Sequence, residues 1–257
     1  MEPIQIDISK DPRRIDLQGP ILVAHQPEFL PWLGNISKAT MGDIYLFFDT
    51  DQFKKETFQN RNRIRVKNQE GFQWLIIPVK DAKTRMMREN EVQMHDNNWK
   101  QKHLRSIKHS YSKATFFDKY FSSIERLYSY ENNDLAGFLI KIVAFALKEF
   151  KINVPVYRTS ELIKQGFLFE GKSTDIIISM CKAFNAKTFV AGVTGKTYLD
   201  KKAFETEKIQ LVFQNFEHPV YNQLHGEFVP NMSFIDLLFN QGPESIKILR
   251  KSNYHLG

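Results

Sequence analysis

The chain has 257 residues, 42% of them hydrophobic, and a formal charge of +7 at pH 7. This globular composition excludes a disordered chain, a collagen-like chain and a small disulfide scaffold. One cysteine, Cys181, cannot form an internal disulfide. The sequence shows neither the apolar segment of a signal peptide nor an apolar run near 18 residues, so we expect a cytoplasmic protein without a membrane span.

The excess positive charge is moderate, with 36 Lys and Arg against 29 Asp and Glu. Its densest cluster, residues 61–67, suits either a phosphate-rich ligand or the solvated face of a strand. No base-stacking motif accompanies the cluster, so we expect no nucleic-acid partner. A nucleotide-sugar is one phosphate-rich ligand that the cluster could bind.

In chain order, residues 1–20 are predicted to form an irregular N-terminal arm. Hydrophobic patterning then predicts buried strands and helices in alternation, with a long loop over 80–96. The predicted strands are 21–24, 44–48, 74–79, 154–158, 187–191 and 209–214. The predicted helices are 32–41, several within 97–150, 173–185, one from Ser233 to the Gly242-Pro243 stop signal, and 244–251.

Apolar strands separated by helices indicate an α/β fold. We expect a Rossmann-like, mostly parallel sheet with helices on both faces. Residues 21–257 would form a single domain, in which 97–150 is a helical insertion or subdomain.

Polar side chains follow the first two predicted strands, and parallel strands end at one edge of a sheet, where open α/β folds bind ligands. The side chains expected to converge there are His25, Gln26, Asp49, Asp51 and Gln52. The alternative is that the residues after the first strand form only a tight turn that caps the next helix.

The next polar run, Asn60-Arg61-Asn62-Arg63, could clamp a phosphate or carboxylate, because arginine binds such groups in a bidentate way. A polar loop before the third strand is the competing interpretation.

Two later strand ends also carry polar residues. Lys196, in a loop with two glycines, could bind an anion, although a plain turn is equally consistent. After the sixth strand, His218, Tyr221 and Gln223 could face the same cleft, or form a structured loop with a packed tyrosine.

Residues 166–173 match the pattern GxxxxGK[ST], but the segment before them is polar and not a buried strand. We therefore interpret Ser173 or Thr174 as a helix N-cap. No zinc-ligand spacing is present, so no metal site is predicted.

Several runs resemble the WbqC-like family of bacteria, above all HQPEFLPWLG with NRNRI downstream, WLIIPV over 74–79, and HPVYNQLHGEFVPNMSFIDLLFNQG over 218–242. The family is associated with bacterial polysaccharide loci, notably O-antigen biosynthesis, and some members are described as transferring glycine or another acyl group to a sugar. The resemblance therefore implies a cytoplasmic transferase that modifies an activated or amino sugar.

Under this hypothesis His25 is the general base or a hydrogen-bond donor to the transition state, while Asp49 and Asp51 orient the acceptor or hold a divalent ion. Arg61 and Arg63 neutralise a substrate phosphate, and Trp32 stacks on a sugar or base, unless it is a core aromatic.

A more distant similarity, to HIGH-type nucleotidyl-transfer and pantothenate-synthetase folds, makes ATP with magnesium a candidate cofactor, although Asn35 stands where that signature has its second histidine. Lys38, Arg61, Arg63 and Lys196 would then stabilise phosphoryl charge in an adenylate-forming ligase or nucleotidyltransferase. A non-catalytic sugar- or nucleotide-binding module is the third alternative.

Overall fold

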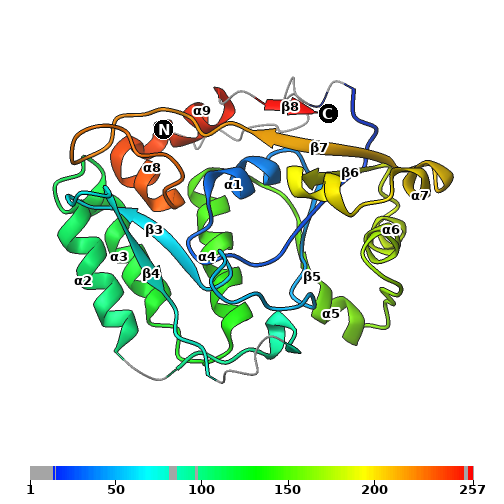
Figure 1. Ribbon diagram of the computed structural model, residues 1–257, viewed down its shortest axis with the longest axis horizontal. Coiled ribbons are helices and arrows are strands. Elements are labelled where there is room, and N and C mark those ends of the chain that lie inside the picture. The colour runs from blue at the N-terminus through cyan, green and yellow to red at the C-terminus, as the bar shows by residue number, and fades with distance from the viewer. Residues whose placement is uncertain (1–13, 15, 81–85, 96–97, 252–253, 257) are drawn as a thin grey trace.

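A computed structural model describes residues 14, 16–80, 86–95, 98–251 and 254–256 (Figure 1). Most of the predicted N-terminal arm, residues 1–13 and 15, lies outside this described part. The central sheet has six strands in the spatial order β5-β2-β1-β6-β7-β8. Their bounds are β1 (Ile21–His25), β2 (Ile44–Phe47), β5 (Val156–Arg158), β6 (Thr188–Gly192), β7 (Gln210–Phe216) and β8 (Tyr254–Leu256).

Neighbouring strands run parallel from β5 through β7, and only β8 is antiparallel, at the edge beside β7. If the strands of this sheet are counted in chain order, their spatial order is 3-2-1-4-5-6, the order of dinucleotide-binding Rossmann folds. The predicted Rossmann-like, mostly parallel sheet is confirmed.

Helices lie between successive strands of the sheet in the chain. The predicted helical stretch over 97–150 contains α2 (Trp99–Tyr111), α3 (Phe117–Tyr128) and α4 (Leu135–Glu149). The remaining α-helices are α1 (Leu33–Ala39), α5 (Thr159–Lys164), α6 (Thr174–Ala183), α7 (Lys201–Thr206), α8 (Phe234–Gln241) and α9 (Ser245–Lys251). Short 3-10 helices are η4 (Glu89–Glu91), η5 (Val193–Thr197) and η6 (Gly242–Glu244). None of the helices in the described ranges is long and apolar enough to cross a membrane.

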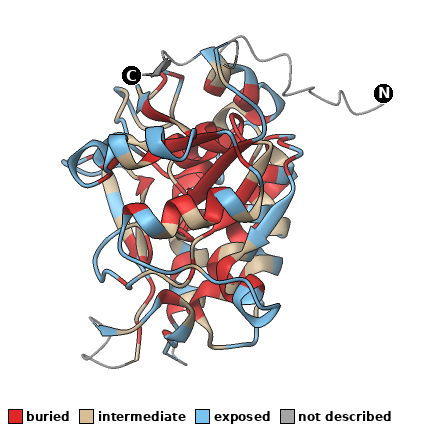
Figure 2. Ribbon diagram, turned by 90° about the vertical axis from the view of Figure 1, so that its right-hand side faces the viewer, coloured by how far each residue is buried: buried red, intermediate tan, exposed pale blue. Residues whose placement is uncertain are grey.

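The sheet divides the interior into two hydrophobic clusters, because successive strand side chains point to opposite faces. Val23 of β1 packs in a large cluster with residues of α1, α4 and α8. Leu22, its neighbour in β1, packs in a second cluster with residues of α6 and α7. Figure 2 shows the buried strands enclosed by helices whose outer surfaces are exposed. The prediction of helices on both faces is therefore confirmed.

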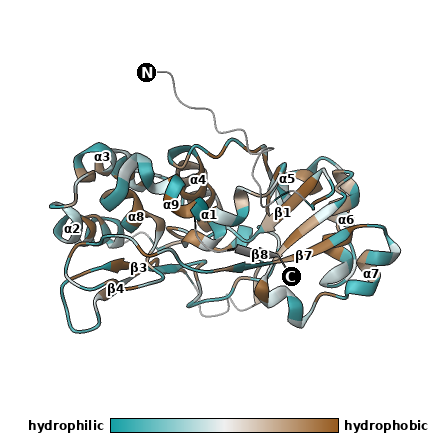
Figure 3. Ribbon diagram, turned by 90° about the horizontal axis from the view of Figure 1, so that it is seen from above, coloured by the Kyte–Doolittle hydropathy of each residue, from teal (hydrophilic) through white to brown (hydrophobic). Residues whose placement is uncertain are grey.

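One predicted strand has a different place from the one expected. The strand predicted at 74–79 is β4 (Phe72–Ile76), which pairs only with β3 (Arg61–Arg65) in a separate antiparallel hairpin. Figure 3 shows this hairpin beside the helical layer, apart from the main sheet. The interpretation of 60–63 as a loop is therefore wrong from Arg61 onward. The other interpretation, in which the charged cluster is the solvated face of a strand, holds for Arg61 and Arg63, which are partly exposed, while Asn62 and Ile64 are buried.

Candidate functional site

A cavity of about 650 Å³ lies where the strand order of the sheet reverses. From β1 the chain adds β2 and β5 on one side, and then β6 and β7 on the other. Open α/β folds bind ligands outside the carboxyl ends of the strands at such a switch point. The lining includes the predicted site residues His25, Gln26, Lys38 and Asp51, together with Lys54, Ser173, Gly192, Thr194 and Tyr198.

His25 is the last residue of β1, and 24% of its side chain is exposed. Its Nδ1 lies 2.9 Å from the carbonyl oxygen of Gln26. Because a carbonyl can only accept, the proton of the neutral ring sits on Nδ1, and Nε2 keeps its lone pair. Burial, with a contribution from the charge of Lys38, lowers the pKa of His25 to about 3. His25 is therefore a neutral base at physiological pH.

Glu28, which the sequence analysis did not identify, is the second titratable group of the site. Its Oε1 lies 3.7 Å from Nε2 of His25, and its Oε2 accepts a hydrogen bond of 2.9 Å from Asn35. Tyr45 in turn donates to Asn35, which fixes the amide. Burial raises the pKa of Glu28 to about 7. The spacing of three residues from His25 was the available signal, but the turn after β1 obscured it.

Lys38 reaches the cavity from α1, as the prediction of a binding role requires. Its side chain is buried, and its ammonium donates to the carbonyl oxygen of Ala24 at 3.1 Å. Burial lowers the pKa of Lys38 to about 8, and the nearby Glu28 opposes that shift. His25, Glu28 and Lys38 thus form one coupled polar centre at the end of β1.

Gln26 and Asp51 meet across the carboxyl ends of β1 and β2. The Gln26 amide donates to Oδ2 of Asp51, and both residues line the cavity. Gln52, the next residue, is exposed and lines a shallow depression formed by residues 52–56. The predicted convergence therefore holds for His25, Gln26 and Asp51, whereas Gln52 lies beside the cavity.

Asp49 lies outside the cavity lining and is fully buried. Its Oδ2 accepts 2.6 Å hydrogen bonds from Arg158 Nε and Ser160 Oγ. Its Oδ1 accepts from the hydroxyl of Thr159 and the backbone N–H of Ser160. With both oxygens engaged, this carboxylate joins β2 to the start of α5.

The last residue of the GxxxxGK[ST] match over 166–173 is Ser173. It stands at the N-terminus of α6 and lines the cavity. No side-chain capping bond forms at Ser173. Thr174 instead uses its hydroxyl to accept a hydrogen bond from the backbone N–H of Asp200. Lys196 lies in η5 with its ammonium 5.5 Å from the centroid of the Phe213 ring, and it does not line the cavity.

The two predicted asparagines lie outside the cavity and bind the backbone. Asn60 donates to the carbonyl oxygen of Ile77. Asn62, fully buried, donates to the carbonyl oxygens of Phe29 and Leu30 in the loop between β1 and α1. Asn62 therefore fixes the loop that carries Glu28.

The remaining basic and aromatic candidates gather on another surface. Arg61 and Arg63 lie over aromatic rings of β4. Trp32, at the start of α1, stacks on Phe58 and meets Phe216 edge-on. His218 packs near Phe216, and burial, with a smaller contribution from the charge of Arg63, lowers its pKa.

Tyr221 and Gln223 bind a buried carboxylate far from the cavity lining. Both donate to Oδ2 of Asp236 at 2.8 Å. Tyr111 donates to the other oxygen at the same distance, and burial raises the pKa of Asp236. This network joins α2, α8 and the loop after β7.

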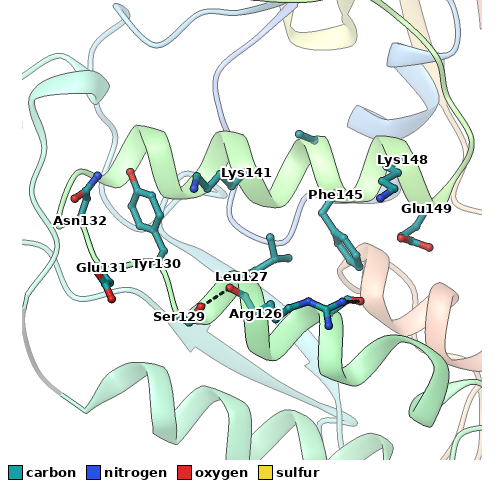
Figure 4. A pocket seen from close by; sticks show the side chains of 12 residues that line it. Arg126, Leu127, Ser129, Tyr130, Glu131, Asn132, Lys141, Phe145, Lys148 and Glu149 are labelled. Atoms are coloured by element: carbon teal, nitrogen blue, oxygen red, sulfur yellow. Dashed lines mark hydrogen bonds between the residues drawn. The ribbon is translucent and has the colours of Figure 1, made fainter.

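A second hollow of about 660 Å³ lies between α3 and α4. Figure 4 shows its side chains, with the basic residues Arg126, Lys141 and Lys148 beside acidic ones. It contains none of the predicted site residues. Within the described residues, no group of three or more His, Cys, Asp or Glu side chains is placed to hold a metal ion.

Similarity to known proteins covers nearly the whole chain. The chain is 26% identical to the uncharacterized protein Rv1507c of Mycobacterium tuberculosis over 226 residues, which is 88% of this chain and 95% of that protein. No solved structure is significantly similar to it. The model of the WbqC-like protein family matches residues 26–248, and the chain therefore belongs to that family.

Proposed function

We propose that the protein transfers an acyl or aminoacyl group, of the glycyl type, to a sugar in bacterial polysaccharide or O-antigen biosynthesis. The substrates would meet in the cavity between β1 and β6. The observation that carries this proposal is the neutral imidazole of His25, whose tautomer is fixed by the carbonyl of Gln26, at the wall of this cavity. Membership of the WbqC-like family supports a biosynthetic role.

The transfer step needs a base. A sugar hydroxyl or amine attacks the acyl carbon of the donor, and its proton passes to Nε2 of His25 as the new C–O or C–N bond forms. Collapse of the tetrahedral intermediate then breaks the bond to the donor's leaving group, which takes the proton back from His25. General base catalysis contributes about 10²–10⁴ in rate when the pKa of the base lies near the working pH. Burial weakens His25 as a base, and an ionised Glu28, which favours the imidazolium, counteracts that effect.

Glu28 is placed to stabilise the imidazolium that forms during the step. Its carboxylate lies 3.7 Å from Nε2, and opposite charges at this distance attract strongly in a buried site. Lys38 favours the ionised form of Glu28. We assign both as positioning groups, and we assign Gln26 and Asp51, which also line the cavity, to binding the acceptor. Asp49 holds the strand ends in place and takes no part in the chemistry.

A thermal-shift panel of the full chain tests the proposal, using nucleotide-sugars, amino sugars, acyl-CoAs and free glycine. A ligand at a hundred times its Kd adds about 2.7 kcal/mol to the free energy of unfolding. Donor and acceptor pairs that shift the melting temperature are then incubated together, and mass spectrometry detects the acylated sugar. Binding without turnover for every pair, unchanged in His25→Ala, would instead identify a non-catalytic binding module.

Adenylate-forming or nucleotidyl-transfer chemistry is a second candidate, because the strand order is that of nucleotide-binding folds and Ser173, at the start of α6, lines the same cavity. ATP with magnesium would then be the cofactor. Magnesium-dependent release of pyrophosphate, lost in His25→Ala, would support this candidate over acyl transfer without ATP.

A further inference from the structure

The β3–β4 hairpin presents one face to the core and one outward. Cross-strand partners share a face, so Arg61, Arg63, Trp74 and Ile76 lie together on the outward side. Ile76 is 47% exposed there, and the Arg61 side chain is 28% exposed. Phe72 lies on the same side, because it is two residues before Trp74 in β4. We call the two arginines and the two aromatic residues of this side, Arg61, Arg63, Phe72 and Trp74, the arginine face.

The two guanidinium groups of the arginine face lie over aromatic rings of β4. The Cζ atom of Arg61 lies 4.5 Å from the centroid of Trp74, and that of Arg63 lies 4.8 Å from the centroid of Phe72. A guanidinium at this distance from an aromatic ring is attracted to the face of the ring, which restrains its position. The Nε atoms of both arginines are buried without a hydrogen-bond partner.

The positive charge of this face is poorly compensated. Glu56 lies 3.9 Å from Arg61, but that carboxylate is 69% exposed, so the pair is weak. Burial lowers the pKa of Arg63. His218, whose pKa the charge of Arg63 helps to lower, also has a buried Nε2 without a hydrogen-bond partner.

Two guanidinium groups over the same Trp74 ring, with the exposed Glu56 as a weak counter-charge, match a doubly charged oxyanion better than a singly charged carboxylate. We propose that the arginine face is a phosphate-binding site, which holds the phosphate of a sugar phosphate or of a nucleotide-sugar. The site is separate from the cavity, although Lys54 lines the cavity and Glu56, two residues on, contacts Arg61. It is defined by binding alone and does not rest on the proposed reaction.

The experiment uses the three tryptophans of the chain as reporters. The ¹⁵N-labelled full-length protein is titrated with inorganic phosphate, glucose 1-phosphate and UDP-glucose, and the three indole N–H signals are followed and assigned with Trp74→Phe. We expect the Trp74 signal to shift saturably with each phosphate compound. The signal of Trp99, which is buried and donates to the carbonyl of His95, serves as the internal control.

Arg63→Gln is expected to weaken this binding at least about tenfold, because charge-assisted hydrogen bonds are lost. Arg63→Lys keeps the charge but not the planar fork, and we expect an intermediate loss. Arg105→Gln, on the exposed side of α2, makes the same charge change and is the matched control. If Arg63→Gln does not fold, Arg61→Gln, at a side chain that is 28% exposed, is used in its place.

The proposal is overturned if Trp74 does not respond, if glucose or glucuronate shifts it as strongly as glucose 1-phosphate, or if Arg105→Gln weakens binding as much as Arg63→Gln. His25→Gln should leave the Trp74 titration unchanged. A failure of the cavity chemistry is therefore distinguishable from a failure of the phosphate site.

Discussion

Nε2 of His25 and Oε1 of Glu28 lie 3.7 Å apart at the carboxyl end of β1. Burial moves their pKa values in opposite directions, to about 3 for His25 and about 7 for Glu28. At neutral pH an unprotonated imidazole therefore stands beside a carboxyl group close to half ionisation. Pairs of titratable groups whose environments separate their pKa values in this way are typical of acid–base sites.

The pH dependence of stability tests the burial of Glu28 without any substrate. Folding raises its pKa from 4.5 to about 7, so the folded state keeps a proton that the unfolded state releases within this window. The free energy of unfolding of the wild type, relative to Glu28→Gln, should therefore fall as the pH rises from about 4.5 to 7, by on the order of 3 kcal/mol, and level off above. Urea unfolding at pH 5, 6, 7 and 8 measures this difference. A difference that does not vary with pH would contradict the placement of Glu28.

Filling the cavity should abolish ligand binding without unfolding the protein. Gly192 lines the cavity, and a Cβ added there meets no atom within 4 Å. Its backbone is extended, which any residue tolerates. We expect Gly192→Leu to lose the melting shift given by cavity ligands while its own melting temperature stays near the wild-type value. Ser122→Leu, at an exposed position of α3, is the control. Retained binding in Gly192→Leu would place the ligand elsewhere.

The two predicted catalytic aspartates should respond differently to substitution. Asp49→Asn breaks a buried ion pair with Arg158 and should cost about 2–3 kcal/mol in the free energy of unfolding. Asp51→Asn alters a partly exposed residue of the cavity and should cost less than about 1 kcal/mol, but it should weaken ligand binding. Urea unfolding and ligand titration of both variants separate the two roles. If Asp49→Asn weakened ligand binding at full stability while Asp51→Asn lowered only stability, Asp49 and not Asp51 would be the residue that acts in the site.

Tyr221 should behave as a structural residue. Tyr221→Phe removes one hydrogen bond to the buried Asp236 and should cost about 1–2 kcal/mol, with ligand binding and turnover unchanged. Tyr198→Phe is the contrasting variant, because Tyr198 is 59% exposed and lines the cavity. This change should leave stability unaltered. Loss of turnover in Tyr221→Phe at full stability would show that its hydroxyl reaches substrate.

Local sequence signals were sufficient for the part of the site nearest β1. His25, Gln26 and Asp51 follow two strands whose apolar runs identify them, and parallel pairing brings those ends together. The sheet itself was predictable for the same reason. Glu28 was missed because its place depends on the turn after β1, which Asn62 holds from another element.

Long-range contacts explain the other differences. The hairpin strand β3 has no apolar alternation, because Asn62 is buried by binding carbonyl groups and the arginines pack on rings of β4. Tyr221 donates a hydrogen bond to Asp236, fifteen residues later in the chain. No local sequence pattern shows that this carboxylate is buried. Asp49 likewise accepts a hydrogen bond from Arg158, which is 109 residues away in the chain.

The measurement that tests the central claim most directly is the rate of acyl transfer by His25→Gln, compared with the wild type and with His109→Gln, an exposed histidine of α2. Ligand affinity and melting temperature are measured on the same samples. We predict a loss of about 10²–10⁴ in rate for His25→Gln, with cavity ligands still bound and His109→Gln fully active. Transfer at the wild-type rate by a folded His25→Gln protein would contradict the assignment of His25 as the base.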